Sequence, residues 1–269
     1  MSGNVNQKII VLCDFSERMK EVIVHGVRMA SMLNKELCLT GIWKSAPEKT
    51  TVQEKLIKTT HAVKHSAPEL RVSNLVIKHS LYDNIEKLAM SYDAVLVVLH
   101  KADWKPGLKA FRESSIAFLF VSGDLPEYLG YKNVLVPMDY RKASKDTALW
   151  ASFLGRLNRS VVQVVYARES DKEQASVVMK SLQFYKKFLS NLKVAHQMVA
   201  GKSSSWSICS ETIARAGELK GDVMLFAGSA SITLLDLLVG LPEKRIIRKA
   251  GDLPILIVNP RKEICMVCD

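Results

Sequence analysis

The strongest constraint on the fold of this chain is a pattern that occurs in it twice. Three segments of the first half match three segments of the second half in their order of apolar and polar residues: 9–15 matches 134–140, 93–97 matches 222–226, and 116–121 matches 253–258. A pattern repeated over this length indicates two homologous domains. Gly123, Pro126 and Gly130 cluster between the two copies. We therefore predict one domain over residues 1–129 and a second over residues 130–269.

The two copies differ most in one connection. Between the fourth and fifth apolar runs, the first copy has the sixteen residues 100–115, whereas the second copy has the twenty-five residues 228–252. We therefore expect a long loop at this point in the second domain and a trimmed loop in the first.

Short apolar runs alternate with longer amphipathic stretches in each copy. The runs are rich in Val, Ile and Leu and nearly continuous, which is typical of strands buried on both faces of a sheet. They predict strands at 8–12, 36–43, 71–78, 94–99 and 116–121 in the first copy, and at 133–136, 160–166, 193–199, 223–227 and 254–258 in the second.

The stretches between these runs have helical periodicity. Val178, Leu182 and Tyr185 recur at the spacing of one helical turn, and Ser16 and Ser205 are predicted N-caps of the helices that follow them. Strands that alternate with helices form right-handed crossovers and a parallel sheet. We therefore expect the α/β class, with two tandem five-stranded parallel sheets, each inside a Rossmann-like α/β/α sandwich. Such sheets bind ligands beyond the carboxyl ends of their strands.

Composition excludes several classes of protein. Hydrophobic residues make up 48% of the chain and charged residues 24%, which is close to the globular average and excludes a disordered or collagen-like chain. The uncharged stretch 223–235 is shorter than the roughly 20 residues of a membrane span, and the polar residues 1–7 lack the apolar core of a signal peptide. The five cysteines are a poor basis for a disulfide scaffold and predict a cytoplasmic protein.

The chain is basic, with a formal net charge of +11. Two basic clusters, at 141–145 and 244–249, are interpreted either as an anion-attracting rim at the strand ends or as a solvated surface. No basic stripe is interleaved with aromatic residues, so we do not expect nucleic acid to be the partner.

Several residues carry a resemblance to a known family. They are the strand ends Val-Pro-Met-Asp139 and Val-Leu-Cys-Asp14, the segment 226–229 that leads to Gly240, and the ending 250–258. On these residues nearly the whole chain resembles a tandem universal stress protein. The resemblance implies two domains of the adenine nucleotide alpha hydrolase-like fold. It also implies that their last strands pair within the chain as a pseudo-dimer, and a further homodimer stays open.

ATP-binding members of that family carry a loop of glycine, two residues, glycine, nine residues, and glycine followed by Ser or Thr. Aligned with this loop, Gly228 takes the first position, Ser231 the second, and Gly240 the third, one residue early. The motif is thus degenerate in the second domain, and in the first domain residues 100–103 stand in its place. The resemblance implies an adenine-nucleotide site, for ATP or a related nucleotide, at Asp139, Gly228, Ser229, Ser231 and Gly240 of the second domain.

Elementary chemistry weakens the loop as a phosphate site. Such a loop needs backbone N–H groups that point inward, and Pro242 lacks one, although the loss is harmless in the first turn of a helix over 243–249. That helix N-terminus would attract an anion, but Glu243 opposes it. The resemblance implies that Asp14, like Asp139, lies near the adenine. Both aspartates have a second interpretation, as helix N-caps that need no ligand.

Other candidate sites have simple explanations. Cys265 and Cys268 form a C-x-x-C that trails the last strand and has no second pair for zinc, so we interpret them as incidental thiols that could oxidise. His61 and His65 lie one helical turn apart and are interpreted as a solvated helix face. No motif positions a nucleophile, an acid–base pair or a metal, so we assign no catalytic and no metal-binding residues.

These observations predict a non-enzymatic stress-response protein that acts by binding a ligand or an unknown protein partner, with weak or absent ATP binding. The alternative is an ATP- or AMP-binding sensor that uses the second domain. A third interpretation is a basic surface that binds nucleic acid or an acidic protein, which would show a steep dependence on salt.

Overall fold

The structure is a computed structural model that describes residues 7–123, 130–229 and 242–260. The described residues divide into two compact units, one on each side of residues 124–129. The predicted boundary between residues 129 and 130 borders this segment, which lies outside the described residues. None of the helices formed by the described residues is long and apolar enough to cross a bilayer.

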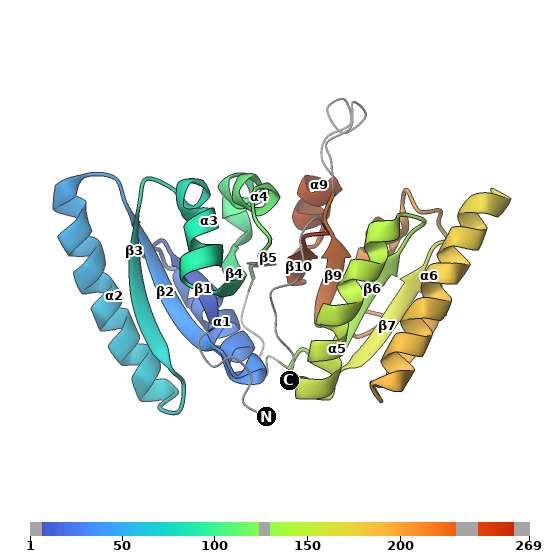
Figure 1. Cartoon of the computed structure of the whole chain (residues 1–269), viewed down its shortest axis with the longest axis horizontal. Coiled ribbons are helices and arrows are strands. Elements are labelled where there is room, and N and C mark those ends of the chain that lie inside the picture. Colours follow the sequence, from blue (N-terminus) through green and yellow to red (C-terminus); the bar gives the residue numbers. More distant parts are fainter. Residues whose placement is uncertain (1–6, 124–129, 230–241, 261–269) are drawn as a thin grey trace. The chain divides into compact units, whose positions relative to one another are not determined.

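The first unit contains five parallel strands in the order β3-β2-β1-β4-β5 (Figure 1). The strands are β1 (Lys8–Cys13), β2 (Glu36–Trp43), β3 (Val72–Lys78), β4 (Ala94–His100) and β5 (Ala117–Val121). Four α-helices and one short 3-10 helix connect them: α1 (Met19–Leu33), α2 (Ala46–Ser66), α3 (Leu81–Ser91), η1 (Lys101–Asp103) and α4 (Trp104–Arg112). The strand order reverses direction at β1 and β4, which makes their carboxyl ends the switch point of this sheet.

Close packing at glycines assigns the helices of the first unit to the two faces of its sheet. A Cβ atom on Gly26 of α1 would meet Val11, and one on Gly41 of β2 would meet Val52 of α2. Val11 and Gly41 lie on the same face, because Val11 pairs with Leu39, two residues before Gly41. Gly107 of α4 instead packs on Leu99, on the opposite face, and α3 lies beside α4 (Figure 1). The unit is therefore an α/β/α sandwich, as predicted.

The second unit repeats this plan with the strand order β10-β9-β6-β7-β8. Its strands are β6 (Asn133–Met138), β7 (Val161–Tyr166), β8 (His196–Ala200), β9 (Val223–Ala227) and β10 (Ile255–Val258). Its helices are η2 (Lys142–Asp146), α5 (Thr147–Asn158), α6 (Lys172–Asn191), α7 (Ile208–Ala214) and α9 (Pro242–Lys249). Here β6 and β9 are adjacent and form the switch point, so the residues that follow them face the same end of the sheet.

The predicted strands are present in both units, and the differences lie at their ends. The largest is in β8, which begins at His196 instead of 193. Lys193 has a left-handed backbone with φ of 54°, and it closes the turn after α6 through its N–H bond to the Ser190 carbonyl. A residue in this conformation cannot continue an extended strand.

Both predicted serine N-caps are wrong. Helix α1 begins after Arg18 without a side-chain cap, because the Ser16 hydroxyl donates to the Asp14 carboxylate. Helix α7 begins after Ser207, and the Ser205 hydroxyl accepts the Tyr140 N–H instead. Both serines are therefore held by the strand ends rather than by the helices.

Replacing Gly155 of α5 by alanine is expected to lower the unfolding free energy of the second unit by about 1–2 kcal/mol. The new Cβ would lie 2.2 Å from Cγ1 of Val194, and this clash outweighs the gain of up to about 1 kcal/mol in helix propensity. Gly217→Ala is the control, because nothing lies within 4 Å of its Cβ position. Urea denaturation compares the two, and equal midpoints would contradict the packing argument.

Candidate functional site

The carboxyl end of β6 carries a buried carboxylate whose two oxygens are both bound by the protein. Asp139 is 4% exposed. Its Oδ1 accepts the Arg141 N–H at 2.8 Å and the Ser144 hydroxyl at 2.5 Å, and its Oδ2 accepts Arg141 Nε–H at 2.7 Å. The carboxylate thus closes the turn that leads into η2 and neutralises Arg141. Both of its oxygens are engaged by the protein itself.

The neighbouring strand end, after β9, is also occupied. The Gly228 N–H donates to the Val258 carbonyl at 2.9 Å and so extends the pairing of β9 with β10. The Ser229 N–H donates to Glu243 Oε1 at 2.6 Å. These are the first two N–H groups that a phosphate loop would offer. Both are taken up by the chain.

Glu243 is the unexpected member of this site. It lies in the first turn of α9 and is 1% exposed. Its Oε1 accepts from Ser229, and its Oε2 is buried without a hydrogen-bond partner among the described residues. A carboxylate bound by a loop N–H at a helix N-terminus has the position and charge of a bound anion. Glu243 therefore fills with its own side chain the kind of site that the sequence assigned to phosphate.

Arg141 links the two strand ends. Its guanidinium lies 5.4 Å from the Phe226 ring centroid on β9, and one-third of its side chain is exposed. Burial lowers the pKa of Arg141, but the Asp139 carboxylate, with a smaller effect from Glu243, raises it above the ordinary value overall. One guanidinium therefore faces two buried carboxylates. A phosphate group would bring more negative charge into a site that already has an excess.

Among the described cysteines, the one that lies beside Asp139 is inert. Burial, reinforced by the Asp139 charge, raises the pKa of Cys209 to about 12. A thiol with that pKa carries almost no thiolate at neutral pH, and the thiolate is the reactive form. No group of three or more His, Cys, Asp or Glu residues able to hold a metal ion occurs in the described part of the chain. His61 and His65 are exposed on α2 and do not belong to such a group.

The first unit has a different structure at the matching place. Asp14 follows β1 but is one-third exposed, accepts the Ser16 N–H at 3.0 Å, and lies 3.6 Å from Arg18. After β4 the chain enters η1 at once, and His100 Nδ1 accepts the Ala102 N–H at 3.0 Å. The short 3-10 helix leads directly into α4. In the first unit a helix therefore takes the place of a phosphate loop.

The charge at this end of the first unit also opposes a phosphate. Asp103 of η1 has a raised pKa, mainly because it is buried and also because the Asp14 carboxylate lies nearby. Two carboxylates thus share the space beyond β1 and β4. Arg18 is the counter-charge that the structure places beside Asp14.

The structure brings together the predicted site residues that it describes. Asp139, Gly228 and Ser229 lie at adjoining strand ends of the second unit, whereas Ser231 and Gly240 lie outside the described residues. Cys265 and Cys268 lie outside them as well. Neither Asp14 nor Asp139 is a helix N-cap: α1 and η2 begin after Arg18 and Arg141, and each aspartate accepts the backbone N–H two residues later, in an Asx turn.

Sequence reasoning missed the partners of these residues. It did not predict that Arg141 and Ser144 bind Asp139 or that Glu243 binds Ser229. A signal for the last contact was present, because a glutamate directly after a proline at a helix start places a carboxylate beside unpaired N–H groups. The hydrogen bond between Ser229 and Glu243 forms only because the fold brings the end of β9 next to the start of α9.

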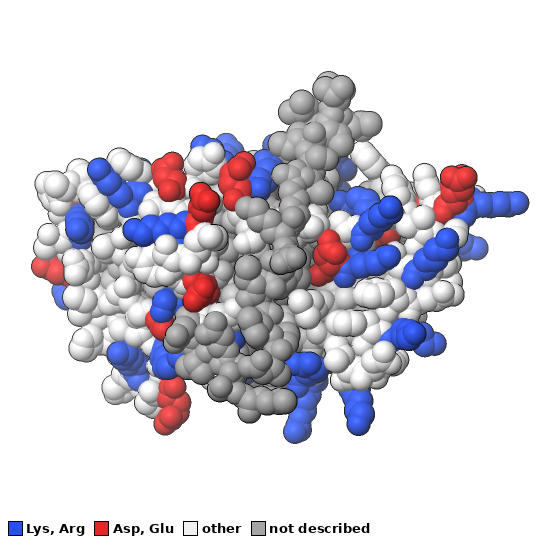
Figure 2. Space-filling view, in the orientation of Figure 1, with Lys and Arg blue, Asp and Glu red and all other residues white. Residues whose placement is uncertain are grey.

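The basic residues of the two clusters make different contacts. Arg141 pairs with Asp139, and Arg245 lies over the Trp206 ring at 5.8 Å from its centroid. Arg248 and Lys249 are in the last turn of α9, at the opposite end of the helix from Glu243. On the face shown in Figure 2, basic and acidic side chains are interspersed.

Comparison with known proteins identifies the fold. Neither a family model nor a curated protein matches the sequence. A universal stress protein from Archaeoglobus fulgidus DSM 4304 superposes with a TM-score of 0.73 at 12% identity, covering 96% of this chain and 100% of that one. A functionally unknown protein from Pseudomonas aeruginosa PAO1 superposes with a TM-score of 0.62 at 12% identity, covering 96% and 94%. With the repeated five-stranded units and their strand order, these matches show that the chain has the tandem universal stress protein fold.

Proposed function

We propose that this chain is a non-enzymatic stress-response protein that acts by binding a ligand or a protein partner, and that its ATP binding is weak or absent. One observation carries the second half of this proposal: the buried Glu243 carboxylate accepts the Ser229 N–H at 2.6 Å. Because the Gly228 N–H is bound to Val258 as well, phosphate would have to displace contacts that the folded protein already makes.

The alternative is a sensor of ATP or AMP that uses the second unit. Asp139, Gly228 and Ser229 would then contact the nucleotide, together with Ser231 and Gly240. The placement of the first three at one switch point favours this alternative. Their existing hydrogen bonds count against it, because each would have to be exchanged for a bond to the ligand at little net gain.

Nucleotide binding is expected to appear only when the Glu243 carboxylate is removed. The wild type at about 1 mM ATP, ADP or AMP, with and without Mg²⁺, should show no rise in Tm. Glu243→Ala frees the Ser229 N–H and removes the negative charge, and should gain at least about tenfold in affinity over the wild-type limit, or about 1.4 kcal/mol. Glu243→Gln removes the charge but keeps an amide oxygen for Ser229, so its nucleotide affinity should lie between those of the wild type and Glu243→Ala.

Glu173→Ala is the matched control, because Glu173 is an exposed glutamate in the first turn of α6. It should behave like the wild type. A clear rise in wild-type Tm with ATP would establish the sensor alternative. If Glu243→Ala and Glu173→Ala respond alike, the carboxylate does not control the site.

A further inference from the structure

Among the described residues, no strand pairs with the outer edge of β3, the last strand in the sheet of the first unit. The Leu37 N–H donates to the Arg71 carbonyl and the His79 N–H donates to the Trp43 carbonyl, each at 2.9 Å. Odd-numbered residues of this segment therefore face β2, and the main-chain groups of Asn74, Val76 and Lys78 point away from it. Strand β3 is the end of the strand order of this unit. Its outward row of donors and acceptors is a template for another strand.

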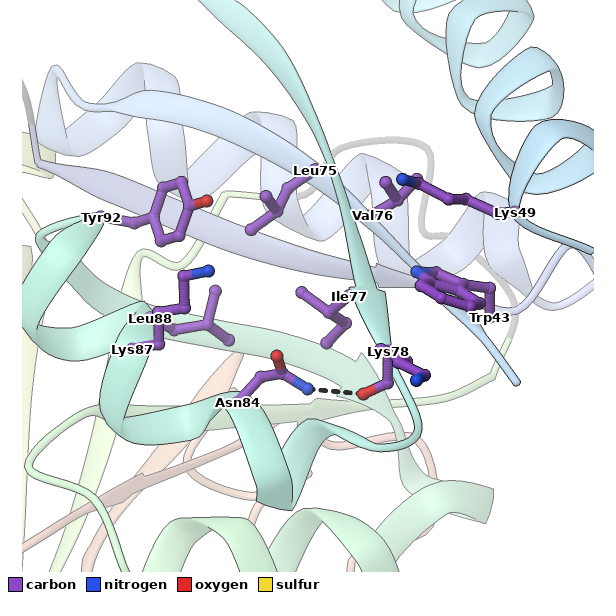
Figure 3. Close-up of a pocket in the computed structure, with 10 residues that line it drawn as sticks. All are labelled: Trp43, Lys49, Leu75, Val76, Ile77, Lys78, Asn84, Lys87, Leu88 and Tyr92. Atoms are coloured by element: carbon purple, nitrogen blue, oxygen red, sulfur yellow. Dashed lines mark hydrogen bonds between the residues drawn. The ribbon is translucent and has the colours of Figure 1, made fainter. Parts of the chain in front are cut away.

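A cavity of about 210 Å³ lies along this open edge (Figure 3). The strand contributes four consecutive residues to it, Leu75 to Lys78. The other lining residues come from the elements on either side of the strand: Trp43, Lys49, Asn84, Lys87, Leu88 and Tyr92. Leu75 and Ile77 lie on the α3 face, whereas Val76 and Lys78 share the α2 face with Gly41. The cavity thus follows the edge itself and is bordered by both faces of the sheet.

The cavity is positively charged on both faces. Lys49 and Lys78 lie over the Trp43 ring, at 5.7 Å and 5.4 Å from its centroid, and Lys87 lies over the Tyr92 ring at 6.0 Å. None of the ten lining residues is acidic. None of the three lysines forms a salt bridge with a residue that the structure describes. Three lysines that form no salt bridge with a described residue thus lie over aromatic rings beside the outer strand.

Asn84 limits the length of the open edge. Its Nδ2 donates to the Lys78 carbonyl at 2.7 Å and to the Ser80 carbonyl at 2.8 Å. The outward carbonyl at the end of β3 is therefore already bound, as the dashed line in Figure 3 shows. The N–H and carbonyl of Val76 are the central pair that an added strand would use.

We infer that the β3 edge binds an extended, acidic segment of a partner protein as an additional strand. Alternating N–H and C=O groups are matched by another peptide main chain, which gives this mode its affinity. The side chains of an added strand alternate between the faces, so adjacent acidic residues would reach Lys49 and Lys78 on one face and Lys87 on the other. A second copy of this chain is disfavoured, since its own β3 edge would bring the same lysines against these. This surface is separate from the strand ends of the second unit, so the inference goes beyond nucleotide binding there.

Fluorescence polarisation with a labelled peptide tests the inference on the full chain. The probe is the blocked peptide Thr-Val-Glu-Glu-Val-Glu-Val-Thr, and a version with lysine in place of each glutamate is its control. Val76→Pro removes the outward N–H and leaves the ladder to β2 intact, and it should weaken binding at least about tenfold. The double variant Lys49→Glu/Lys87→Glu should weaken it at least as much.

Two matched variants separate this site from general effects. Val72→Pro removes an outward N–H of the same strand outside the cavity, and Lys58→Glu reverses an exposed charge of α2 outside it. Both should stay within about twofold of the wild type. Equal binding by Val76→Pro and the wild type would overturn strand addition. So would equal loss in Lys58→Glu and the double variant, equal binding of the lysine peptide, or no binding of the acidic peptide at millimolar concentration.

Discussion

Replacing Asp139 by alanine is expected to lower the unfolding free energy of the second unit by about 3 kcal/mol. The change removes three hydrogen bonds, two to Arg141 and one to Ser144, from a carboxylate that is almost completely buried. It also leaves the Arg141 guanidinium without its closest counter-charge. This loss of stability is expected without any bound ligand, because the Asp139 carboxylate itself connects the end of β6 to the start of η2.

Asp14→Ala is the matched control, since Asp14 has the equivalent place in the first unit. Its side chain is one-third exposed, and its Arg18 partner lies at 3.6 Å, so the expected loss is below about 1 kcal/mol. Asp139→Asn should be intermediate, because its amide oxygen can still accept from Ser144. Urea denaturation followed by circular dichroism measures all three. Equal losses at the two positions would show that Asp139 is not held for structural reasons, which would favour the nucleotide-sensor alternative.

The strands were predictable because each carries its signal locally. In a parallel sheet covered on both faces, a strand such as β4 or β9 must be apolar throughout, and a repeated sequence confirms the pattern by occurring twice. The residues at which the helices and strands begin were less predictable. Ser16 is a good N-cap in isolation, but the Asp14 carboxylate two residues away competes for its hydroxyl.

The candidate site was predictable only in part, for a related reason. The positions of Asp139, Gly228 and Ser229 follow from the strand order, because residues after adjacent parallel strands gather at one end of the sheet. The hydrogen-bond partners of those residues do not follow from the strand order. The Ser229 N–H is bound by a glutamate fourteen residues later, across a connection whose path no local periodicity specifies. The strand order therefore predicts where these residues lie, whereas the contact of Glu243 with Ser229 depends on the folded structure.

The shortened loop of the first unit has a structural role that connects to α1. His100 Nε2 lies 3.3 Å from Glu21 Oε2, and the Lys101 charge is close enough to affect His25, one turn further along the same helix. His100 at the end of β4 and Lys101 at the start of η1 thus lie close to Glu21 and His25 of α1. Because His25 is buried with a lowered pKa, we expect the first unit to be sensitive to acid.

The first unit is expected to lose about 3 kcal/mol of stability through His25 as the pH falls from 7 to 4. Burial, with a smaller effect from the Lys101 charge, lowers the pKa of His25 from 6.5 to about 4, and the side chain is 3% exposed. Between these values the unfolded chain binds a proton that the folded chain does not. The contribution is therefore fully present above pH 6.5 and is lost as the pH falls towards 4.

His25→Gln removes the titrating group, so its unfolding free energy should fall less steeply than that of the wild type between pH 6.5 and pH 4. His61→Gln is the control, because His61 is an exposed histidine of α2 in the same unit and should leave the pH dependence unchanged. Urea midpoints at several pH values give the three curves, and the carboxylates that titrate in the same range cancel in the differences. If the curves of His25→Gln and the wild type are parallel, His25 has a normal pKa in the folded protein. The surroundings of His25 in the folded protein would then not exclude water from its imidazole, and burial would not hold the side chain neutral.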